Sequence, residues 1–477
     1  MSERASPRLI DGFVDRTLAN LRIAWREIAS SARAVRNHLP RPDLPDDDVG
    51  RLRQQMLGCL DPRGGEVTAR ARAAELGRTY LALNSTGRER FLRLLAEEFD
   101  IDHAAVERCC AEVAEATTAA ERSAAERELR AALSPPRLNL LRHFNALPEG
   151  VKFLVDMRAE LLRFANGDHV LRGLADDLRE LLANWFDIGF LELKRITWDS
   201  SAALLEKLMG YEAVHEIRGW TDLKNRLEAD RRCFAFFHPR MPEEPLIFVE
   251  IALVNGMAGN IQGLLDEAAP IGNPQEADSA IFYSISNCQR GLVGISFGDF
   301  LIKRVVDALA AELPRLKIFA TLSPIPAFRN WLAAEADRGE LLLPAEARAV
   351  HGLGGDPTQP AEGELLALLD TPNWPDDPRT VAALRDPLMR LAAQYLLQAQ
   401  GRSSRALDPV AHFHLTNGAR IERLNWLGDR SPNGLRQSAG IMVNYAYRLD
   451  DIEANHAAYQ EGGRAAATAV RNLLRSG

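Results

Sequence analysis

Residues 280–326 read AIFYSISNCQRGLVGISFGDFLIKRVVDALAAELPRLKIFATLSPIP, and this stretch decides the fold. The runs at 280–285 and 317–322 are rich in β-branched and aromatic residues, as is typical of strands. Between them, apolar residues recur at helical spacing on one face, namely Phe300, Leu301, Val305, Leu309 and Leu313. A strand, a glycine-bearing loop, a helix and a second strand in this order predict a βαβ unit.

Outward from this unit, four more short apolar runs predict strands. They lie at 233–237, 246–254, 412–415 and 441–447. A segment dense in Gly, Pro, Asp and Thr at 352–378 predicts a surface excursion between helices. The region from 188 to 477 is therefore expected to be an α/β domain built around a sheet.

The N-terminal part of the chain has a different pattern. Up to about residue 187, Leu, Ala, Arg and Glu recur every three to four positions with almost no β-branched alternation. The stretch 111–132 predicts one long exposed helix, because its composition favours helix and its charges suit a solvated face. We therefore predict an α+β protein with an all-helical domain at 1–187 followed by the α/β domain at 188–477.

Composition excludes several classes of protein. A net charge of -8 argues against nonspecific binding to nucleic acid or to an anionic membrane, since both require surplus Lys and Arg. No apolar run reaches the roughly 18 residues needed to span a bilayer. The N-terminus resembles no secretion or organelle signal, so we expect a cytoplasmic protein. The 5 cysteines include no C-x-x-C pair, and we expect them to be reduced.

The loop at 289–298, QRGLVGISFG, is the first candidate for chemistry. Its glycines let backbone amides approach a ligand, and the following helix N-terminus favours anions, so a phosphate site is one interpretation and a plain turn is the other. Gly294 to Gly298 also match G-x-S-x-G, the nucleophile elbow of hydrolases, with Asp408 and His414 downstream of Ser296. The upstream glycine-rich oxyanion motif of hydrolases is not found, which disfavours this alternative.

Two further segments carry candidate side chains. Ser323 ends the second strand and precedes Pro324 and Pro326, which stiffen the chain and suit a fixed catalytic hydroxyl. The local sequence alone favours the alternative, a turn hydroxyl that caps the next helix. His412 and His414 would share a face if their segment is a strand. A histidine is the usual proton donor in catalysis, while a metal site lacks an evident third ligand and His412 suits a hydrogen-bonded structural role.

These segments together resemble the malonyl-CoA decarboxylase family. The matching stretches are RRCFAFFHP, AIFYSIS, QRGLVGISFGDFLIKRVV, FATLSPIPAFRNWL, DPVAHFHLTNGARIERLNW and SAGIMVNYAY, in family order between 185 and 447. The resemblance implies a helical N-terminal domain, a catalytic domain similar to GNAT-type acetyltransferases, and a homo-oligomer, namely a tetramer joined through helical domains. It also implies that Ser323 and His414 are the catalytic pair. The residues that it implies for malonyl-CoA binding are Val293, Gly294, Ile295, Ser296, Phe297, Gly298 and Asp299. Gln289 at the start of the same loop and Lys303 in the following helix are added as candidates from the phosphate-site interpretation.

The implied reaction suits these residue types. Loss of CO2 from malonyl-CoA leaves a thioester enolate, whose oxygen needs donors such as Ser323 or backbone amides. His414 would then protonate the carbon, with Ser323 holding its orientation. Neither step requires a metal or cofactor. An acyl-CoA-dependent acetyltransferase and a non-catalytic acyl-CoA-binding protein are the alternatives, and the sequence leaves open whether the reaction disposes of malonate or controls fatty-acid synthesis.

Overall fold

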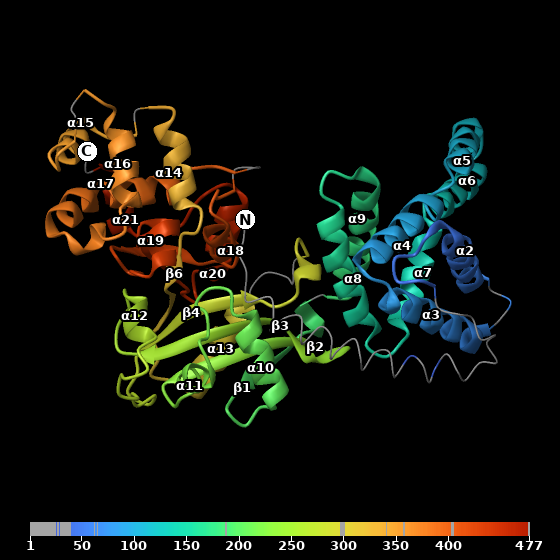
Figure 1. Cartoon of the computed structure of the whole chain (residues 1–477), viewed down its shortest axis with the longest axis horizontal. Helices are drawn as coiled ribbons and strands as arrows, with labels where there is room; N and C mark the ends of the chain where they lie inside the picture. Colours follow the sequence, from blue (N-terminus) through green and yellow to red (C-terminus); the bar gives the residue numbers. More distant parts are fainter. Residues whose placement is uncertain are drawn as a thin grey trace. The chain divides into compact units, whose positions relative to one another are not determined.

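The computed structural model describes residues 25, 28, 40–61, 63, 65–186, 188–295, 301–339, 341–355, 358–401 and 405–475. The chain divides into two compact units (Figure 1). The first comprises Met1–Glu192, Phe237–Leu246 and Asn287–Phe297, and the second comprises Leu193–Phe236, Ile247–Ser286 and Gly298–Gly477.

The first unit is mainly helical. Its helices are α2 (Asp46–Leu60), α3 (Gly65–Ala82), α4 (Ser85–Glu98), α5 (His103–Glu115), α6 (Ala119–Ala132), α7 (Pro136–Asn145), α8 (Gly150–Phe164) and α9 (His169–Ala183), with the 3-10 helices η2 (Ile188–Phe190) and η3 (Arg290–Leu292). Buried aromatic rings form the centre: Phe153 lies 4.8 Å from Trp25 and 5.0 Å from Phe144 between ring centroids. The predicted helical N-terminal region is confirmed.

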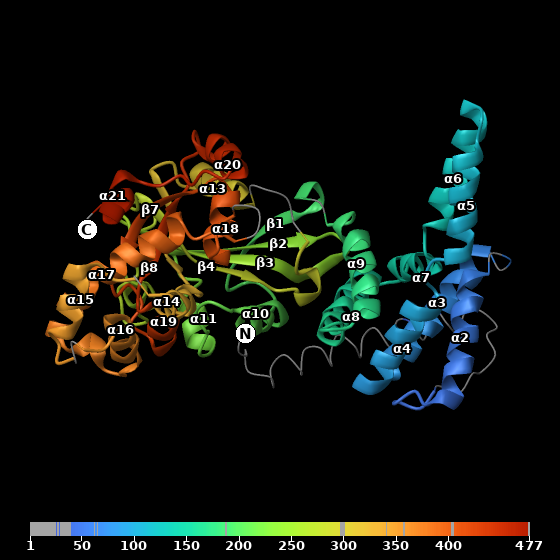
Figure 2. The same cartoon turned by 90° about the horizontal axis from the view of Figure 1, so that it is seen from above.

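The stretch predicted as one long helix is two helices. The chain breaks between α5 and α6, where the Thr118 hydroxyl accepts from the Glu121 amide and the Glu121 carboxylate accepts from the Thr118 amide. This reciprocal capping box satisfies the free amides of a helix start, which makes the break favourable. The two helices lie side by side (Figure 2), so the prediction of a single helix over 111–132 is wrong.

The second unit contains most of a mixed sheet. In the described part of the chain its strands are β1 (Glu192–Ile196), β2 (Arg231–His238), β3 (Met241–Val254), β4 (Ser279–Asn287), β5 (Ile318–Thr321), β6 (Ser323–Pro324), β7 (Arg420–Asn425) and β8 (Met442–Ala446). Their order is β1-β2-β3-β4-β5-β8-β6, with β7 also paired to β8. β4 and β5 are parallel, whereas β8 runs antiparallel to β5, β6 and β7.

The helices of the second unit lie between its strands and after them in the sequence. They are α10 (Ala202–Tyr211), α11 (Trp220–Asn225), α12 (Ile261–Leu264), α13 (Leu301–Glu312), α14 (Phe328–Ala336), α15 (Pro344–His351), α16 (Ala361–Asp370), α17 (Pro378–Leu397), α18 (Pro409–Thr416), α19 (Pro432–Ser438), α20 (Ile452–Gln460) and α21 (Thr468–Asn472), with 3-10 helices η4 (Trp374–Asp376) and η6 (Leu473–Arg475). Because α13 links the parallel strands β4 and β5, the predicted βαβ unit is confirmed, as is the α/β class of this region.

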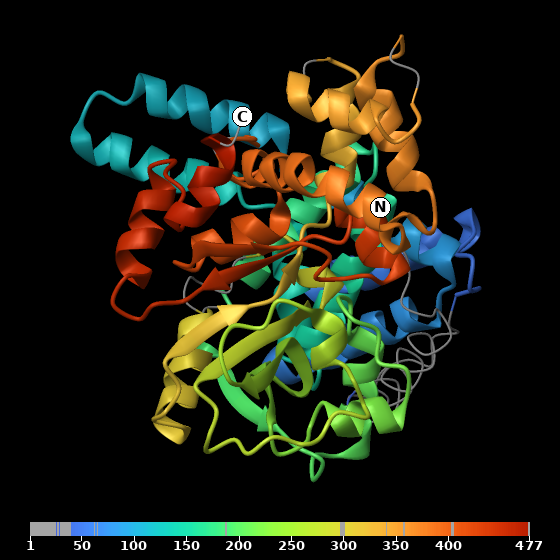
Figure 3. The same ribbon diagram turned by 90° about the vertical axis from the view of Figure 1, so that its left-hand side faces the viewer.

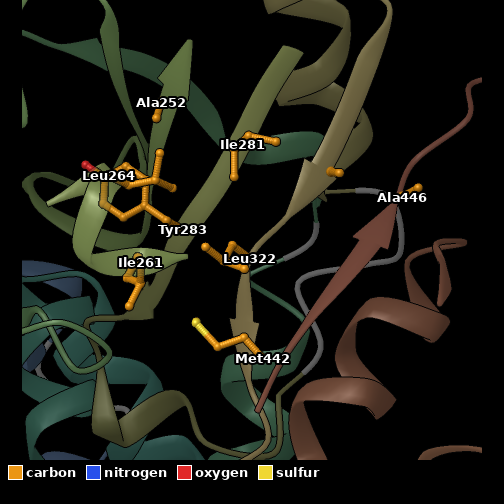
Figure 4. Packing of buried hydrophobic residues seen from close by; sticks show 9 residues of the cluster. Ala252, Ile261, Leu264, Ile281, Tyr283, Leu322, Met442 and Ala446 are labelled. Atoms are coloured by element: carbon orange, nitrogen blue, oxygen red, sulfur yellow. The ribbon is translucent and has the colours of Figure 1, made fainter. Parts of the chain in front are cut away.

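A hydrophobic cluster packs against one face of the sheet. Its buried members are Ala252, Ile261, Leu264, Ile281, Tyr283, Ala320, Leu322, Met442 and Ala446 (Figure 4). Side chains alternate along a strand, so Met442 and Ala446 of β8 face this cluster while Tyr445 faces the opposite side of the sheet. That opposite side carries the candidate site.

Two local predictions in this unit are wrong. The segment 412–415 belongs to helix α18 rather than to a strand, because Asp408 accepts from the Val410 and Ala411 amides and Pro409 occupies the first helical position. The excursion predicted at 352–378 contains helix α16, which buries Leu365 and Leu369. Helices α14 to α17, coloured orange, pack against one another (Figure 3).

Candidate functional site

Ser323 is the first residue of β6 and follows the end of β5 by two residues. It is 7% exposed and pairs with Val443 of β8, which fixes its backbone. Its Oγ donates to Thr321 Oγ1 at 2.9 Å and lies 3.2 Å from His414 Nε2. The next helix, α14, begins after Ala327 without a side-chain cap, so the structure does not support the alternative in which Ser323 is a capping hydroxyl.

His414 lies inside the protein in the last turn of α18. The ring is 2% exposed and stacks on Tyr445, with centroids 4.5 Å apart and 27° between the planes. Its two nitrogens have different partners: Nε2 faces Ser323, and Nδ1 lies 2.7 Å from the Tyr447 hydroxyl. Two hydrogen-bond partners and a stacked neighbour hold the imidazole in one orientation.

Burial controls the protonation of this ring. Desolvation lowers the pKa of His414 from its usual 6.5 to about 3, because removal of water penalises the charged imidazolium. Burial also raises the pKa of Tyr447 well above its ordinary value. At neutral pH the pair is therefore a neutral imidazole beside a neutral phenol.

The two histidines of the H-x-H segment do not share a face. Residues two apart on a helix point about 200° apart around its axis. His412 Nδ1 instead lies 2.8 Å from the Tyr459 hydroxyl, as expected for a hydrogen-bonded structural histidine. Within the described residues, no group of three or more His, Cys, Asp or Glu side chains could hold a metal ion.

Asp408 begins the helix that carries His414 and is itself 1% exposed. Burial raises the pKa of this carboxyl to about 6, although the Ala411 and Val410 amides oppose the shift. The folded protein thus binds this proton more tightly than the unfolded chain does. Stability from this group is present near pH 4 and is lost as the pH rises through about 6.

We therefore expect Asp408→Asn, which keeps the capping oxygen, to remove this pH dependence. Relative to the variant, the free energy of unfolding of the wild type should fall by on the order of 3 kcal/mol between pH 4 and pH 7. Urea denaturation of both proteins across this range measures the difference. Parallel stability curves would contradict the buried-carboxyl explanation.

The predicted phosphate loop belongs to the first unit and is described as far as Ile295. Gly291 packs so closely on helix α8 that an added Cβ would lie 1.8 Å from the Val155 carbonyl oxygen, which excludes any side chain. Buried Arg158 donates from Nη1 to the Gly291 oxygen at 2.5 Å and to the Val293 oxygen at 2.9 Å. Gly294 follows with a left-handed φ of 77°. The charged Arg158 side chain therefore fixes the shape of this glycine-bearing turn by binding two of its carbonyl oxygens.

The residues predicted to bind substrate have different environments. Gln289 is buried and donates to the Pro245 oxygen at 2.9 Å, whereas Val293 is 64% exposed. Lys303 of the second unit pairs with Glu453 at 3.1 Å. Ile295 is buried. Four other predicted substrate-binding residues lie outside the described part of the chain, namely Ser296, Phe297, Gly298 and Asp299.

Sequence reasoning missed three residues that surround the catalytic candidates, namely Thr321, Tyr445 and Tyr447. All three lie within the apolar strand segments that were quoted as motifs. The alternation of Tyr445 and Tyr447 placed them on one face of a strand, but nothing in the sequence showed that α18 would pack there.

The model of the malonyl-CoA decarboxylase C-terminal domain matches residues 189–477, which is more than half of the chain, and the model of the N-terminal domain of the same family matches 99–186. The chain belongs to the malonyl-CoA decarboxylase family. The predicted resemblance is thereby confirmed, together with the predicted enzyme class, a carboxy-lyase.

Relatives of the family match over most of their length. The mitochondrial malonyl-CoA decarboxylase of Mus musculus is 40% identical over 390 residues, 78% of each chain, and that of Anser anser anser is 39% identical over 410 residues, 82% of this chain and 80% of the relative. The crystal structure of malonyl-CoA decarboxylase from Rhodopseudomonas palustris has 45% identity and a TM-score of 0.81, covering 89% of this chain and 99% of the other. The described residues include no helix long and apolar enough to cross a bilayer.

Proposed function

We propose that this chain converts malonyl-CoA and a proton to acetyl-CoA and CO2, with Ser323 and His414 as the catalytic pair. The observation that carries the proposal is the buried 3.2 Å contact between Ser323 Oγ and His414 Nε2 in a family of decarboxylases. A hydroxyl and a neutral imidazole, both shielded from water, suit a reaction whose difficult species is an enolate.

The chemistry divides into two steps. First, the bond between the carboxylate and the α-carbon breaks, CO2 leaves, and its bonding electrons remain on the thioester as an enolate. Backbone amides supply hydrogen-bond donors to the enolate oxygen, because the one hydroxyl proton of Ser323 is directed at Thr321. Second, the α-carbon takes the proton of His414 Nε2, and the ring regains a proton from solvent when acetyl-CoA leaves. Both steps use groups of the chain alone.

Neutral His414 can act as an acid because a thioester enolate is a strong base. A charged imidazolium would require water or a carboxylate for stabilisation, and burial has removed the water. Tyr447 on Nδ1 and Tyr445 against the ring face keep Nε2 directed at Ser323. The orientation and the protonation state of the acid thus depend on contacts within the second unit.

Residues of the loop are proposed to bind the substrate. Gln289, Val293, Gly294, Ile295, Ser296, Phe297, Gly298, Asp299 and Lys303 are the proposed malonyl-CoA contacts. The close-packed turn with its left-handed glycine supports this role, since exposed amides beside glycines bind phosphate oxygens well.

Arg158→Met is expected to raise KM for malonyl-CoA by about tenfold and to change kcat little. The carbonyl oxygens of Gly291 and Val293 would lose a charged donor, and the turn would lose its shape. Steady-state kinetics measures both constants. Arg163→Met, an exposed position on the same helix, is the matched control. Equal KM values for the two variants would contradict a role of Arg158 in shaping the substrate-binding turn.

Domain roles and assembly are part of the proposal. We propose that residues 1–187 form a helical domain through which copies assemble into a homotetramer, and that 188–477 form a GNAT-like catalytic domain in a cytoplasmic enzyme. The family models support a boundary nearby, because one ends at 186 and the other begins at 189.

The reaction class is tested with malonyl-CoA in the presence and absence of amine acceptors. A decarboxylase forms acetyl-CoA and CO2 equally in both mixtures. An acetyltransferase would release free CoA only when an amine is present, and a non-catalytic acyl-CoA-binding protein would leave the thioester intact. Mass spectrometry of the CoA species separates the three outcomes.

A further inference from the structure

Thr321 connects the catalytic pair to the backbone of the sheet. It is the last residue of β5 and is fully buried. Its Oγ1 accepts from the Tyr445 amide at 3.1 Å and from the Ser323 hydroxyl at 2.9 Å. The Tyr445 amide is part of the backbone and has a fixed position. It therefore holds Thr321 Oγ1 in place as an acceptor for the Ser323 hydroxyl.

We propose that Thr321 is a positioning residue for the decarboxylation: by accepting the hydroxyl proton of Ser323, it holds the imidazole of His414 with its proton on Nε2. This inference rests on the proposed function, to which it adds the origin of the acidic proton. Nothing in the family assignment concerns this threonine.

The inference follows from counting protons. A serine hydroxyl has one proton, and that of Ser323 is directed at Thr321. Ser323 Oγ must therefore accept at its contact with His414, which requires a proton on Nε2. A neutral imidazole has only one N–H, so Nδ1 is bare and accepts from the Tyr447 hydroxyl.

The result is a row of hydrogen bonds in which the donor-to-acceptor direction is the same throughout. Tyr447 donates to His414, His414 donates to Ser323, and Ser323 donates to Thr321. Among the described residues, the structure gives the Tyr447 hydroxyl no other partner, so its proton is available to His414 Nδ1. Each bond polarises the next, which strengthens the whole row.

Loss of the Thr321 acceptor would reverse the row. In Thr321→Val, a side chain of similar shape, the Ser323 proton has no oxygen to approach and turns to His414 Nε2. The imidazole proton then moves to Nδ1 and is donated to Tyr447. The nitrogen that faces Ser323 is left without the proton that the enolate carbon requires.

Nitrogen NMR of protein labelled with 15N in the histidine rings tests this directly, because protonated and bare ring nitrogens have well-separated shifts. The His414 signals are assigned by their loss in His414→Asn. We expect a protonated Nε2 and a bare Nδ1 in the wild type and in Thr321→Ser, and the reverse in Thr321→Val. A wild type with its proton on Nδ1 would overturn the inference, and this result does not depend on the folding of any Thr321 variant.

Kinetics supplies the second readout. Thr321→Val should lower kcat by about 10²-fold with KM within about threefold, and Thr321→Ser should recover kcat to within about threefold of the wild type. Thr321→Ala replaces the valine variant if the latter does not fold. A valine or alanine variant with the tautomer and kcat of Thr321→Ser would overturn the positioning role. A wild type that is inactive on malonyl-CoA would sink the proposed function, while the spectrum would still decide the tautomer.

Discussion

His414→Asn is expected to lower kcat for malonyl-CoA decarboxylation by about 10²- to 10⁴-fold, the range typical of a lost general acid. The asparagine amide lies near the Nδ1 position and can still meet Tyr447, but it places no proton donor where Nε2 faced Ser323. Substrate affinity should change little, because the proposed contacts to CoA lie elsewhere in the sequence. Steady-state kinetics and equilibrium titration with malonyl-CoA measure the two effects separately.

His412→Asn is the matched control for this variant. It lies on the same helix, is also hydrogen-bonded to a tyrosine, and has no contact with Ser323 among the described residues. Its kcat should stay within about threefold of the wild type. Equal losses in the two histidine variants would indicate damage to α18 rather than removal of an acid.

Ser323→Ala is expected to lower kcat by about 10²-fold. The methyl group leaves Nε2 of His414 without its partner, so the ring loses part of its orientation, and misplacement of a catalytic group by about 1 Å costs a factor of this size. Binding of malonyl-CoA should again be nearly unchanged. The His414 ring would remain buried and neutral, so no new dependence on pH from this residue is expected between pH 5 and 8.

The matched control is Ser279→Ala. Ser279 is fully buried at the start of β4, and its hydroxyl donates to Asp278 at 2.6 Å, so the two substitutions remove comparable hydrogen bonds from the same sheet. Ser279→Ala should affect the free energy of unfolding and leave kcat close to the wild type. If instead Ser323→Ala retains full kcat, the hydroxyl has no part in catalysis.

The sequence predicted the fold where its pattern was long and regular. Residues 280–326 carried two strand runs and a helical face in an order that permits few arrangements, and the structure pairs β4 with β5 in parallel. The helices of the first unit were predicted from periodicity in the same way. These features depend on local spacing, which a single sequence contains.

The errors arose where capping signals outweighed periodicity. His412 to Leu415 alternate like a strand, yet Asp408 followed by Pro409 is a strong start for a helix. Thr118 and Glu121 form a capping box in the middle of a stretch that composition alone makes continuous. Both signals were present in the sequence, and greater weight on them would have predicted both helix starts.

The candidate site was predictable only in part. The motifs pointed to Ser323 and His414 as candidates, and the structure places them in contact. The Tyr447 hydroxyl on Nδ1 depends on α18 packing against the end of β8, which no local pattern specifies. Arg158 beneath the glycine-bearing turn lies 133 residues before Gly291. Such contacts result from tertiary packing, and only the folded chain shows them.

The central claim is tested most directly with malonyl-CoA that carries 13C in its free carboxyl group, incubated with metal-stripped wild-type protein. We expect labelled CO2 and unlabelled acetyl-CoA in equal amounts, with their formation nearly abolished in His414→Asn and unaffected in His412→Asn. Labelled CO2 at the same rate from His414→Asn, or no CO2 above background from the wild type, would contradict the account.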